Sequence, residues 1–232
     1  QMLDISKSPM EVAPTAHYSM GGILVNPYNL STSIKGLFAV GEVAGGLHGA
    51  NRLGGNSLAE ILVFGKRAGD ASAKYSLELN CHYRSNKTIK MAHENLNKFI
   101  KSGSELVRPL QNELQIIMWN YCGVVKNKEL LLKGIHKIEV LKSRLKEVDV
   151  RVDSHNCNDL VQVLDLQSSL VSAESTLISA LERNESRGAH QRSDFKDINN
   201  SFSFNCLVNM DEQSQTLKIS KSKLKTLDKY MN

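Results

Sequence analysis

The sequence predicts an α+β chain: the last part of a nucleotide-binding α/β domain, then a three-helix bundle and a short C-terminal β-hairpin with a tail. Three observations lead to this prediction. A glycine-rich loop at residues 45–55 runs directly into a helical pattern. Glycine-poor stretches with apolar residues at helical spacing follow it, and residues 204–209 and 216–220 flank a polar turn like the strands of a hairpin. We expect domains at residues 1–79, 80–200 and 201–232.

The first predicted element is a short buried strand at residues 34–42, which ends in Gly41 and Glu42. A carboxylate at the end of a strand can accept hydrogen bonds from ribose hydroxyls, so Glu42 is a candidate nucleotide ligand. No Gly-x-Gly-x-x-Gly occurs in the 232 residues. We therefore expect the pyrophosphate-binding turn, and the first half of the nucleotide site, to lie in sequence N-terminal to Gln1.

The glycine-rich loop carries a single arginine, Arg52, and the helix after it is predicted to begin at Asn56 as the N-cap. Glycines let a backbone approach a bound molecule closely, and the free N–H groups of a helix start favour an anion or an electron-rich ring. The sequence therefore predicts a ligand site at this loop. The packing face of the helix is expected to consist of Leu58, Ile61, Leu62, Gly65, Ala68 and Gly69.

The middle of the chain predicts three helices that each have one apolar face and therefore form a bundle. Breaks at residues 123–127 and 149–158 supply the turns, and Asn127 or Asn158 caps the following helix. The three faces consist of Leu106, Leu110, Leu114, Ile117 and Tyr121; of Leu131, Ile135, Ile138, Leu141, Leu145 and Val148; and of Leu160, Val163, Leu164, Leu170, Val171, Leu177, Ile178 and Leu181.

Composition excludes several classes of partner. The net charge is +5 and the pI is about 9.0, but the lysines are dispersed without interleaved aromatic residues, so nucleic acid is not a predicted partner.

The cysteines, Cys81, Cys122, Cys157 and Cys206, form no Cys-x-x-Cys pair. We expect reduced thiols, a cytoplasmic location and no metal site. No apolar run approaches the roughly 20 residues that span a bilayer, so direct membrane insertion is not expected.

Three blocks of sequence resemble the flavoprotein subunits of succinate dehydrogenase and fumarate reductase, a family that includes L-aspartate oxidase. Residues 14–23, PTAHYSMGGI, resemble the substrate-histidine segment of that family. Residues 36–58 resemble its flavin and substrate-arginine segment, and residues 185–195, ESRGAHQRSDF, resemble a block near the end of its helical C-terminal domain. Because their order and approximate spacing also fit, the chain is identified as a member of this family, from its C-terminal portion.

The resemblance implies FAD as the cofactor. Glu42 is then expected to bind the ribose hydroxyls, and the helix start at Asn56, Ser57 and Leu58 is expected to face the pyrimidine end of the flavin. Reduced flavin carries negative charge there, which a helix N-terminus stabilises by about 1 kcal/mol. For Asn56, a role as helix cap alone is an equal alternative.

The substrate implied by the resemblance is a four-carbon dicarboxylate, succinate or fumarate, with one carboxylate held by His17 and Arg52. Arginine matches a carboxylate with a planar fork, and histidine can donate one further hydrogen bond. Hydride would pass between the dicarboxylate and flavin N5. His48 is either a structural residue of the loop or adjacent to the cofactor. The arginine that transfers the proton is expected upstream, and an interdomain salt-bridge set rather than a catalytic group is expected for Arg187, His190 and Arg192.

The resemblance also implies an iron–sulfur subunit that accepts electrons, and membrane contact at the inner face only through such partners. Two other functions stay open: an L-aspartate oxidase that works without a partner, and a noncatalytic helical interaction module. Met20 stands where L-aspartate oxidases tend to carry cysteine, which favours succinate and fumarate chemistry. Lys196 and Asp197 replace a common proline, so the path of that turn is open. We expect the chain alone to have little FAD affinity and no turnover.

Overall fold

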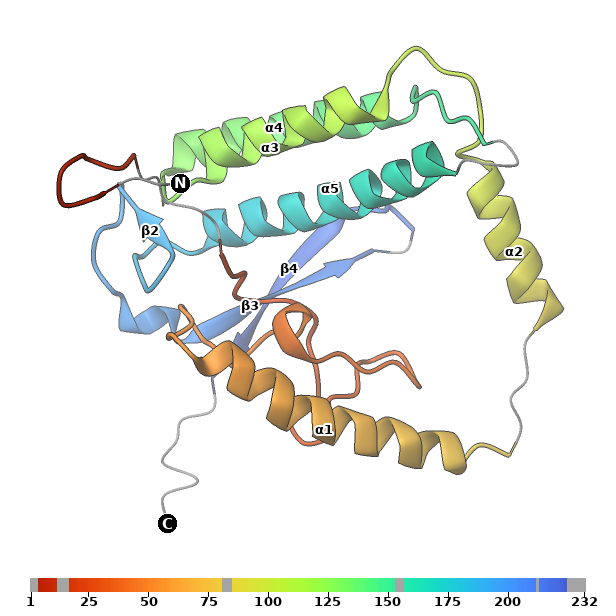
Figure 1. Cartoon of the computed structure of the whole chain (residues 1–232), viewed down its shortest axis with the longest axis horizontal. Coiled ribbons are helices and arrows are strands. Elements are labelled where there is room, and N and C mark those ends of the chain that lie inside the picture. Colours follow the sequence, from red (N-terminus) through yellow and green to blue (C-terminus); the bar gives the residue numbers. More distant parts are fainter. Residues whose placement is uncertain (1–3, 12–16, 81–84, 153–156, 212, 225–232) are drawn as a thin grey trace. The chain divides into compact units, whose positions relative to one another are not determined.

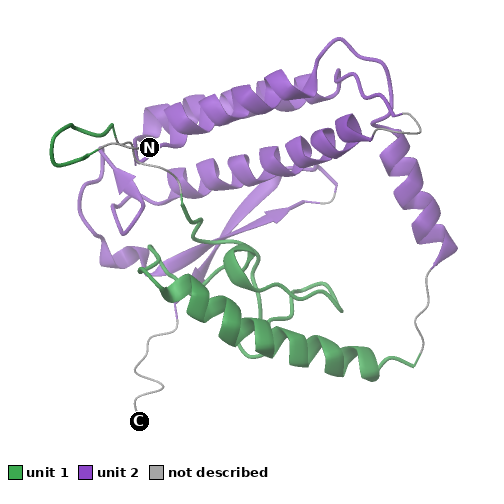
Figure 2. Ribbon diagram, viewed as in Figure 1, with its two compact units in different colours: residues 1–80 green, residues 81–232 purple. Residues whose placement is uncertain are grey.

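The computed structural model describes residues 4–11, 17–80, 85–152, 157–211 and 213–224 (Figure 1). The chain divides into two compact units, residues 1–80 and 81–232 (Figure 2). Helices and two small two-stranded sheets make up the regular structure of the described residues, so the predicted α+β class is confirmed. Residues 14–16 of the first resembling block, and Cys81, lie outside the described part.

Unit 1 consists of irregular chain followed by one long helix, α1 (Asn56–Leu77), with a short 3-10 helix, η1 (Gly41–Val43), before it. The strand predicted for residues 34–42 is not formed. Gly36 and Gly41 adopt φ values of +83° and +78°, which interrupt the extended backbone that a strand needs. The segment instead turns back on itself, because the Leu37 N–H donates to the Ile34 carbonyl at 3.0 Å and Phe38 forms an isolated bridge with Ser31.

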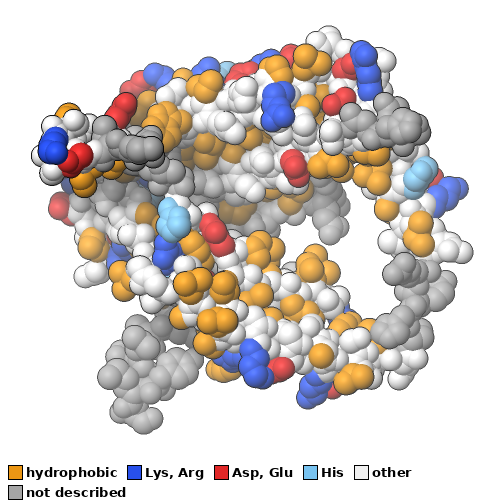
Figure 3. All heavy atoms as spheres, viewed as in Figure 1, with side chains coloured by type: hydrophobic (Ala, Val, Ile, Leu, Met, Phe, Trp, Pro, Cys, Tyr) orange, Lys and Arg blue, Asp and Glu red, His pale blue; other side chains and the backbone are white. Residues whose placement is uncertain are grey.

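Helix α1 already includes Asn56, the residue predicted as its cap. The N-cap position is Gly55, with φ of +84°, and no side chain caps the helix, so the prediction of Asn56 as N-cap is wrong. The predicted apolar face is wrong for its large residues, because Leu58, Ile61 and Leu62 stay 65%, 49% and 74% exposed within the described residues, whereas Ala68 is buried. Hydrophobic side chains are accordingly visible on the surface along this helix (Figure 3). The inward face follows the i, i+4, i+8 spacing of Glu60, Phe64 and Ala68.

Unit 2 contains the three predicted helices, and their bundle is confirmed (Figure 1). A further helix, α2 (Asn86–Asn97), begins after Ser85, whose side chain accepts from the Thr88 N–H. The bundle consists of α3 (Val107–Cys122), α4 (Lys128–Leu145) and α5 (Asn158–Glu182). Asn127 caps α4 as predicted, because its side-chain oxygen accepts from the Leu130 N–H at 2.9 Å.

Apolar side chains from all three helices form the core of unit 2. Each fully buried leucine or isoleucine contributes roughly 1.5–3 kcal/mol relative to an exposed one. Gly134 of α4 allows close contact with its neighbours, since a Cβ there would lie 2.8 Å from Leu177 Cδ2 and 2.9 Å from Tyr121 Cβ. The most deeply buried members are Leu110, Leu131, Ile138, Leu141, Leu166, Leu170 and Leu177.

Two small sheets complete unit 2. Strands β1 (Val125–Lys126) and β2 (Gln191–Arg192) pair in parallel. The predicted hairpin is formed by the antiparallel strands β3 (Phe204–Met210) and β4 (Leu217–Lys223), which contact α5. Cys122, Cys157 and Cys206 are free thiols. None of the described helices has the length and hydropathy that would let it cross a membrane.

Candidate active-site wall

Two glycines bring the first and second predicted blocks into backbone contact in unit 1. The Ile23 N–H donates to the Val43 carbonyl at 2.8 Å, and the Gly45 N–H donates to the Ile23 carbonyl at 3.0 Å. A Cβ on Gly22, whose φ is +141°, would lie 2.2 Å from the Val43 oxygen. Only glycine permits so close an approach, so the segment after His17 is fixed against the start of the glycine-rich loop.

Glu42 provides a second connection between the same two segments. Its Oε1 accepts a hydrogen bond from the Ser19 N–H at 2.8 Å. Its Oε2 has no hydrogen-bond partner among residues 4–11, 17–80 and the other described ranges. Glu42 is exposed, so this second oxygen is open to donors such as hydroxyl groups.

Arg52 lies over the ring of Tyr18. Its guanidinium carbon is 4.7 Å from the ring centroid, the arrangement of a cation–π contact. Its Nη1 makes a long hydrogen bond of 3.3 Å to the Leu53 carbonyl, whereas its Nε is buried without any partner in the described structure. A buried donor left unpaired costs free energy, so this guanidinium is suited to receive an acceptor from a ligand.

A buried carboxyl group bonds to the hydroxyl of the same tyrosine. Glu60 of α1 is 4% exposed, and its Oε2 accepts from the Tyr18 hydroxyl at 2.7 Å and lies 2.7 Å from His48 Nε2. His48 also packs edge-on against the Tyr18 ring, with centroids 5.2 Å apart. Burial of the hydroxyl, followed by its hydrogen bond to Glu60, raises the pKa of Tyr18 to about 12.

Sequence reasoning missed Tyr18 and Glu60, and it left the role of His48 open. The signal available for Glu60 is its position four and eight residues before Phe64 and Ala68, which places an acid on the inner face of the helix. Its burial depends on partners 42 and 12 residues away, which no local pattern specifies. In the structure, His48 of the loop has a hydrogen-bond partner in α1, the Glu60 carboxyl group.

The predicted cofactor residues of the helix start lie immediately after this cluster. Asn56 and Leu58 are exposed and Ser57 is half-buried. The backbone N–H groups of Ser57 and Leu58 donate no hydrogen bond to any described residue, whereas the Asn56 N–H donates to the Leu53 carbonyl at 3.2 Å. Because the N-cap is a glycine without a side-chain acceptor, this helix terminus keeps open donors and a partial positive charge.

His17 is exposed, and its imidazole makes no hydrogen bond, ion pair or ring contact with the described residues. Its backbone position is nevertheless determined by its neighbours. Tyr18 contacts Arg52 and Ser19 contacts Glu42, so the chain next to His17 is held to both candidate residues. The structure thus brings the segment of His17 to Arg52 and Glu42, and leaves the imidazole without a partner among the residues that the structure describes.

The charged block after α5 has a different character. Glu185 is fully buried and accepts hydrogen bonds from Arg183, Arg187 and the Asn199 N–H. Arg192 is 2% exposed and satisfies the last carbonyls of α5, with Nη1 2.9 Å from the Ala180 oxygen, besides pairing with Asp194. Because these groups satisfy one another inside unit 2, they have a structural role, and the interpretation of them as noncatalytic is retained.

His190 belongs to the same block. Its Nε2 lies 3.1 Å from the Arg183 carbonyl oxygen. Burial, and then the positive charge of neighbouring lysine and arginine side chains, lower the pKa of His190 below its usual value. A half-buried imidazole that bonds to a backbone carbonyl supports this turn, which fits a structural role.

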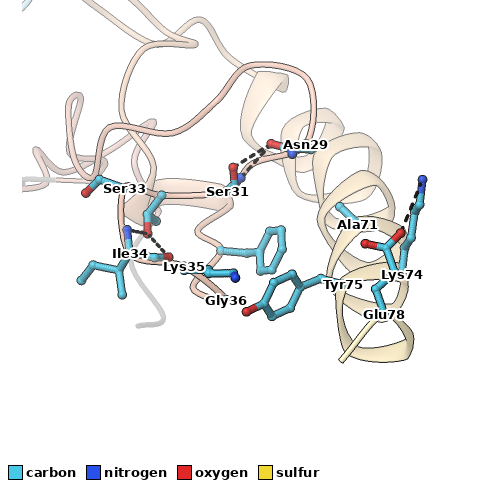
Figure 4. A pocket seen from close by; sticks show the side chains of 12 residues that line it. Asn29, Ser31, Ser33, Ile34, Lys35, Gly36, Ala71, Lys74, Tyr75 and Glu78 are labelled. Carbon is cyan, nitrogen blue, oxygen red and sulfur yellow. Dashed lines mark hydrogen bonds and ion pairs between the residues drawn. The ribbon is translucent and has the colours of Figure 1, made fainter. Parts of the chain in front are cut away.

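Unit 1 also contains an open hollow of about 610 Å³ (Figure 4). Some of its polar groups bond to one another, as in the contacts from Ser31 to Asn29 and from Thr32 to Ile34. None of the predicted site residues lines it, so it is no candidate for the redox site. No group of three or more potential metal ligands is found among the described residues. The hollow is lined by Asn29, Ser31, Thr32, Ser33, Ile34, Lys35, Gly36, Phe38, Ala71, Lys74, Tyr75 and Glu78.

Comparisons with known families agree with both units. Residues 111–230 match the family described as fumarate reductase flavoprotein C-term, and residues 2–58 match the FAD binding domain. A CoM/CoB fumarate reductase chain from Methanothermobacter marburgensis is 37% identical over 92% of this chain and 39% of its own length. The fumarate reductase flavoprotein subunit of Proteus vulgaris is 43% identical over 83% of this chain and 33% of its own.

A solved structure is also similar throughout. The E. coli quinol fumarate reductase FrdA superimposes with a TM-score of 0.89 at 36% identity, over 97% of this chain and 39% of that one. The present chain therefore spans about two fifths of the length of the first of these curated relatives, and a third of the second.

Proposed function

Because the chain belongs to the succinate dehydrogenase and fumarate reductase flavoprotein family, we propose that it forms the flavin- and dicarboxylate-binding wall of an oxidoreductase that interconverts succinate and fumarate. The observation that carries the proposal is the Arg52 guanidinium. It lies on the Tyr18 ring, has a buried Nε without a partner, and has no ion pair to any described carboxylate. A positive charge held in place and left unneutralised is suited to a carboxylate substrate.

The residues present fit FAD. Glu42 keeps one carboxylate oxygen that bonds to none of the described residues, which suits ribose hydroxyls. The N–H groups of Ser57 and Leu58, open among the same residues, suit the electron-rich pyrimidine end of the flavin. Asn56 stands at the same helix start with an exposed side chain. FAD, when bound, supplies the hydride acceptor or donor at N5. The protein's part is to bind the ring and to favour its negatively charged, reduced form through the helix terminus.

For the substrate, we infer that His17 and Arg52 bind one carboxylate together. Arg52 offers N–H groups in a planar fork, and His17 offers an exposed imidazole that contacts no side chain in the described part of the chain. Their pull on that carboxylate withdraws electron density from the neighbouring double bond of fumarate, which eases the arrival of hydride. The same two groups orient succinate for the reverse direction.

Succinate and fumarate are preferred over L-aspartate as substrates for two reasons. The relatives compared above are named fumarate reductases, and the family match to the C-terminal part carries the same name. Met20 also stands where L-aspartate oxidases tend to carry cysteine. A noncatalytic helical module has less support, because residues 2–58 match an FAD binding domain.

For electron transfer, we propose that the partner is an iron–sulfur subunit. The relatives are named as subunits, and the E. coli structure is named a quinol fumarate reductase, which supports electron exchange through a complex. In such a complex this chain would lie on the cytoplasmic side and reach the membrane through its partners. The physiological direction of flux depends on those partners.

The test is a substrate screen of the complete protein with succinate, fumarate and L-aspartate, in air and with artificial electron carriers. The proposal predicts turnover of the first two with artificial carriers, and no hydrogen peroxide from L-aspartate. Peroxide formed from L-aspartate in air would favour the oxidase. Absence of bound FAD and of any turnover would favour the interaction module.

A further inference from the structure

We propose that Glu60 and Tyr18 are positioning residues for Arg52: buried Glu60 fixes the Tyr18 ring, and that ring holds the guanidinium where a substrate carboxylate can reach it. The inference deepens the function proposed above and rests on it. Neither residue needs to contact the substrate, and nothing in the sequence blocks marked either of them as a site residue.

The first step is the burial of Glu60. A carboxylate removed from water is costly unless hydrogen bonds replace the solvent. Glu60 Oε2 has two such bonds of 2.7 Å, to the Tyr18 hydroxyl and to His48 Nε2, and the His48 side chain is itself 8% exposed. These groups therefore have little freedom to move, since any displacement would leave the carboxylate unsatisfied.

The second step is the effect on the Tyr18 ring. A phenol that donates its proton to a carboxylate gains electron density, which strengthens the attraction of its ring for a cation. The Arg52 guanidinium carbon lies 4.7 Å from the centroid of this ring. Because the pKa of Tyr18 is raised to about 12, the hydroxyl keeps its proton and its bond to Glu60 at neutral pH.

The third step is what this arrangement leaves free. An arginine held by a carboxylate would have its charge neutralised and its N–H groups occupied. Arg52 is held by a ring face instead, and the acid that bonds to the hydroxyl of that ring, Glu60, is already bonded to Tyr18 and His48. The guanidinium thus keeps a fixed place, its positive charge and an unpaired Nε. This is the combination that binding of an anion requires.

The experiment compares variants of the complete, FAD-loaded protein in succinate oxidation with an artificial acceptor. Tyr18→Leu removes the ring, Tyr18→Phe keeps the ring but removes the hydroxyl, and Glu60→Gln keeps the shape but removes the charge. Tyr28→Leu and Asp70→Asn are matched controls, because Tyr28 is an exposed tyrosine and Asp70 an exposed acid on α1. KM, kcat, FAD content and melting temperature are measured for each.

We expect Tyr18→Leu to lower kcat/KM by roughly tenfold or more, chiefly through a higher KM, because a misplaced guanidinium weakens binding of the substrate carboxylate, whereas a substrate that does bind still meets the same charge. Tyr18→Phe and Glu60→Gln should lie between Tyr18→Leu and the wild type, at roughly threefold, since the ring stays in place. The two controls should match the wild type. FAD content should stay unchanged in all of the Tyr18 variants.

A purely structural role predicts a different pattern. It would lower FAD content or melting temperature while the loaded fraction kept a wild-type KM, and that result would overturn the inference. Should Glu60→Gln fail to fold, the order of Tyr18→Phe and Tyr18→Leu decides by itself, and equal KM values for the two would be contrary. If the wild-type protein is active and the Tyr18 and Glu60 variants have the same kcat and KM, this inference fails and the proposed function stands. A wild-type protein that turns over neither dicarboxylate defeats the proposed function, and this inference with it.

Discussion

The backbone N–H of Ser19 and Oε1 of Glu42 form a 2.8 Å hydrogen bond that joins two segments 23 residues apart in the chain. One segment carries His17 and the other leads into the glycine-rich loop. The same carboxylate keeps its second oxygen open to donors from outside the described residues. Glu42 therefore links the proposed substrate and cofactor positions, and a change there should be felt at both.

Glu42→Gln is expected to weaken FAD binding in the complete protein. Glutamine keeps an oxygen for the Ser19 N–H but loses the charge and one acceptor. A charge-assisted hydrogen bond is worth about 1.5–3 kcal/mol, so the Kd for FAD should rise roughly 10- to 100-fold. Flavin fluorescence titration of the apoprotein measures this. Glu78→Gln, an exposed acid at the other end of α1, is the control; equal FAD affinity in both variants would refute the role of Glu42.

Arg52→Lys should abolish most activity while FAD stays bound. Lysine keeps the charge but loses the planar fork and the unpaired Nε, so transition-state stabilisation should fall by roughly 2–5 kcal/mol. Steady-state kcat/KM with each dicarboxylate gives this value directly, and His17→Ala should fall in the same class. Arg151→Lys, a largely exposed arginine of unit 2, serves as control. Full activity of Arg52→Lys toward every dicarboxylate would end the substrate assignment.

Gly22→Ala should disrupt the crossing of the two segments. The added Cβ would meet the Val43 oxygen at 2.2 Å, and the φ of +141° is strained for any side chain. We expect the free energy of unfolding to fall by roughly 2–4 kcal/mol. We also expect bound FAD to be lost. Gly69→Ala, in open space on α1, should instead gain up to about 1 kcal/mol. Thermal unfolding of both variants is the measurement, and similar behaviour of the two would speak against the crossing.

Arg192→Met should destabilise unit 2 without altering chemistry. It removes the donor to the Ala180 carbonyl and takes the charged partner from Asp194, which then keeps the Lys128 N–H as a donor in a partly buried place; the loss is roughly 3–5 kcal/mol. Denaturant unfolding of the complete protein should reveal the loss, while kcat/KM per bound flavin stays within about twofold. Arg151→Met, at a largely exposed arginine, is the matched control and should leave stability nearly unchanged. A large kinetic defect with normal stability would give Arg192 a catalytic role after all.

Glu185 makes stability depend on pH. Burial by itself raises the pKa of Glu185, but hydrogen bonds from Arg187, the Asn199 N–H and Arg183 outweigh it and bring the pKa to about 2. Since this pKa is depressed from 4.5 in the folded state, the stabilisation is present above pH 4.5 and is lost as the pH falls toward 2. Melting temperatures of wild type and Glu185→Gln over this range should converge at low pH. A difference that stays constant with pH would contradict the linkage.

Elements that depend on local patterns could be predicted from the sequence. The three bundle helices follow from apolar spacing, the start of α4 from Asn127, and the hairpin from two alternating runs around a polar turn. The strand at residues 34–42 has the composition of a strand, but Gly36 and Gly41 take positive φ in the folded chain. Composition does not specify that choice, because glycine accepts either sign of φ.

The candidate site likewise contains residues that could be predicted from the sequence and residues that could not. Arg52, Glu42 and the helix start were predicted as ligand-binding from glycines, charge and order along the chain, and the resemblance added the substrate role of Arg52 and His17. Glu60 and Tyr18 were not, because a buried acid is recognised only by its partners, and its hydrogen bond to Tyr18 spans 42 residues. The position of α1's inner face was likewise missed. The buried face of α1 is set by packing within unit 1, and the spacing of apolar residues along α1 does not reveal it.

The central claim is that His17 and Arg52 bind the same carboxylate. It is tested most directly by a crystal structure of the complete, FAD-loaded protein with fumarate. The account predicts one fumarate carboxylate within hydrogen-bond distance of both the His17 imidazole and the Arg52 guanidinium, with the Arg52 head group still over the Tyr18 ring. A fumarate bound beside the flavin with neither side chain in contact would contradict it.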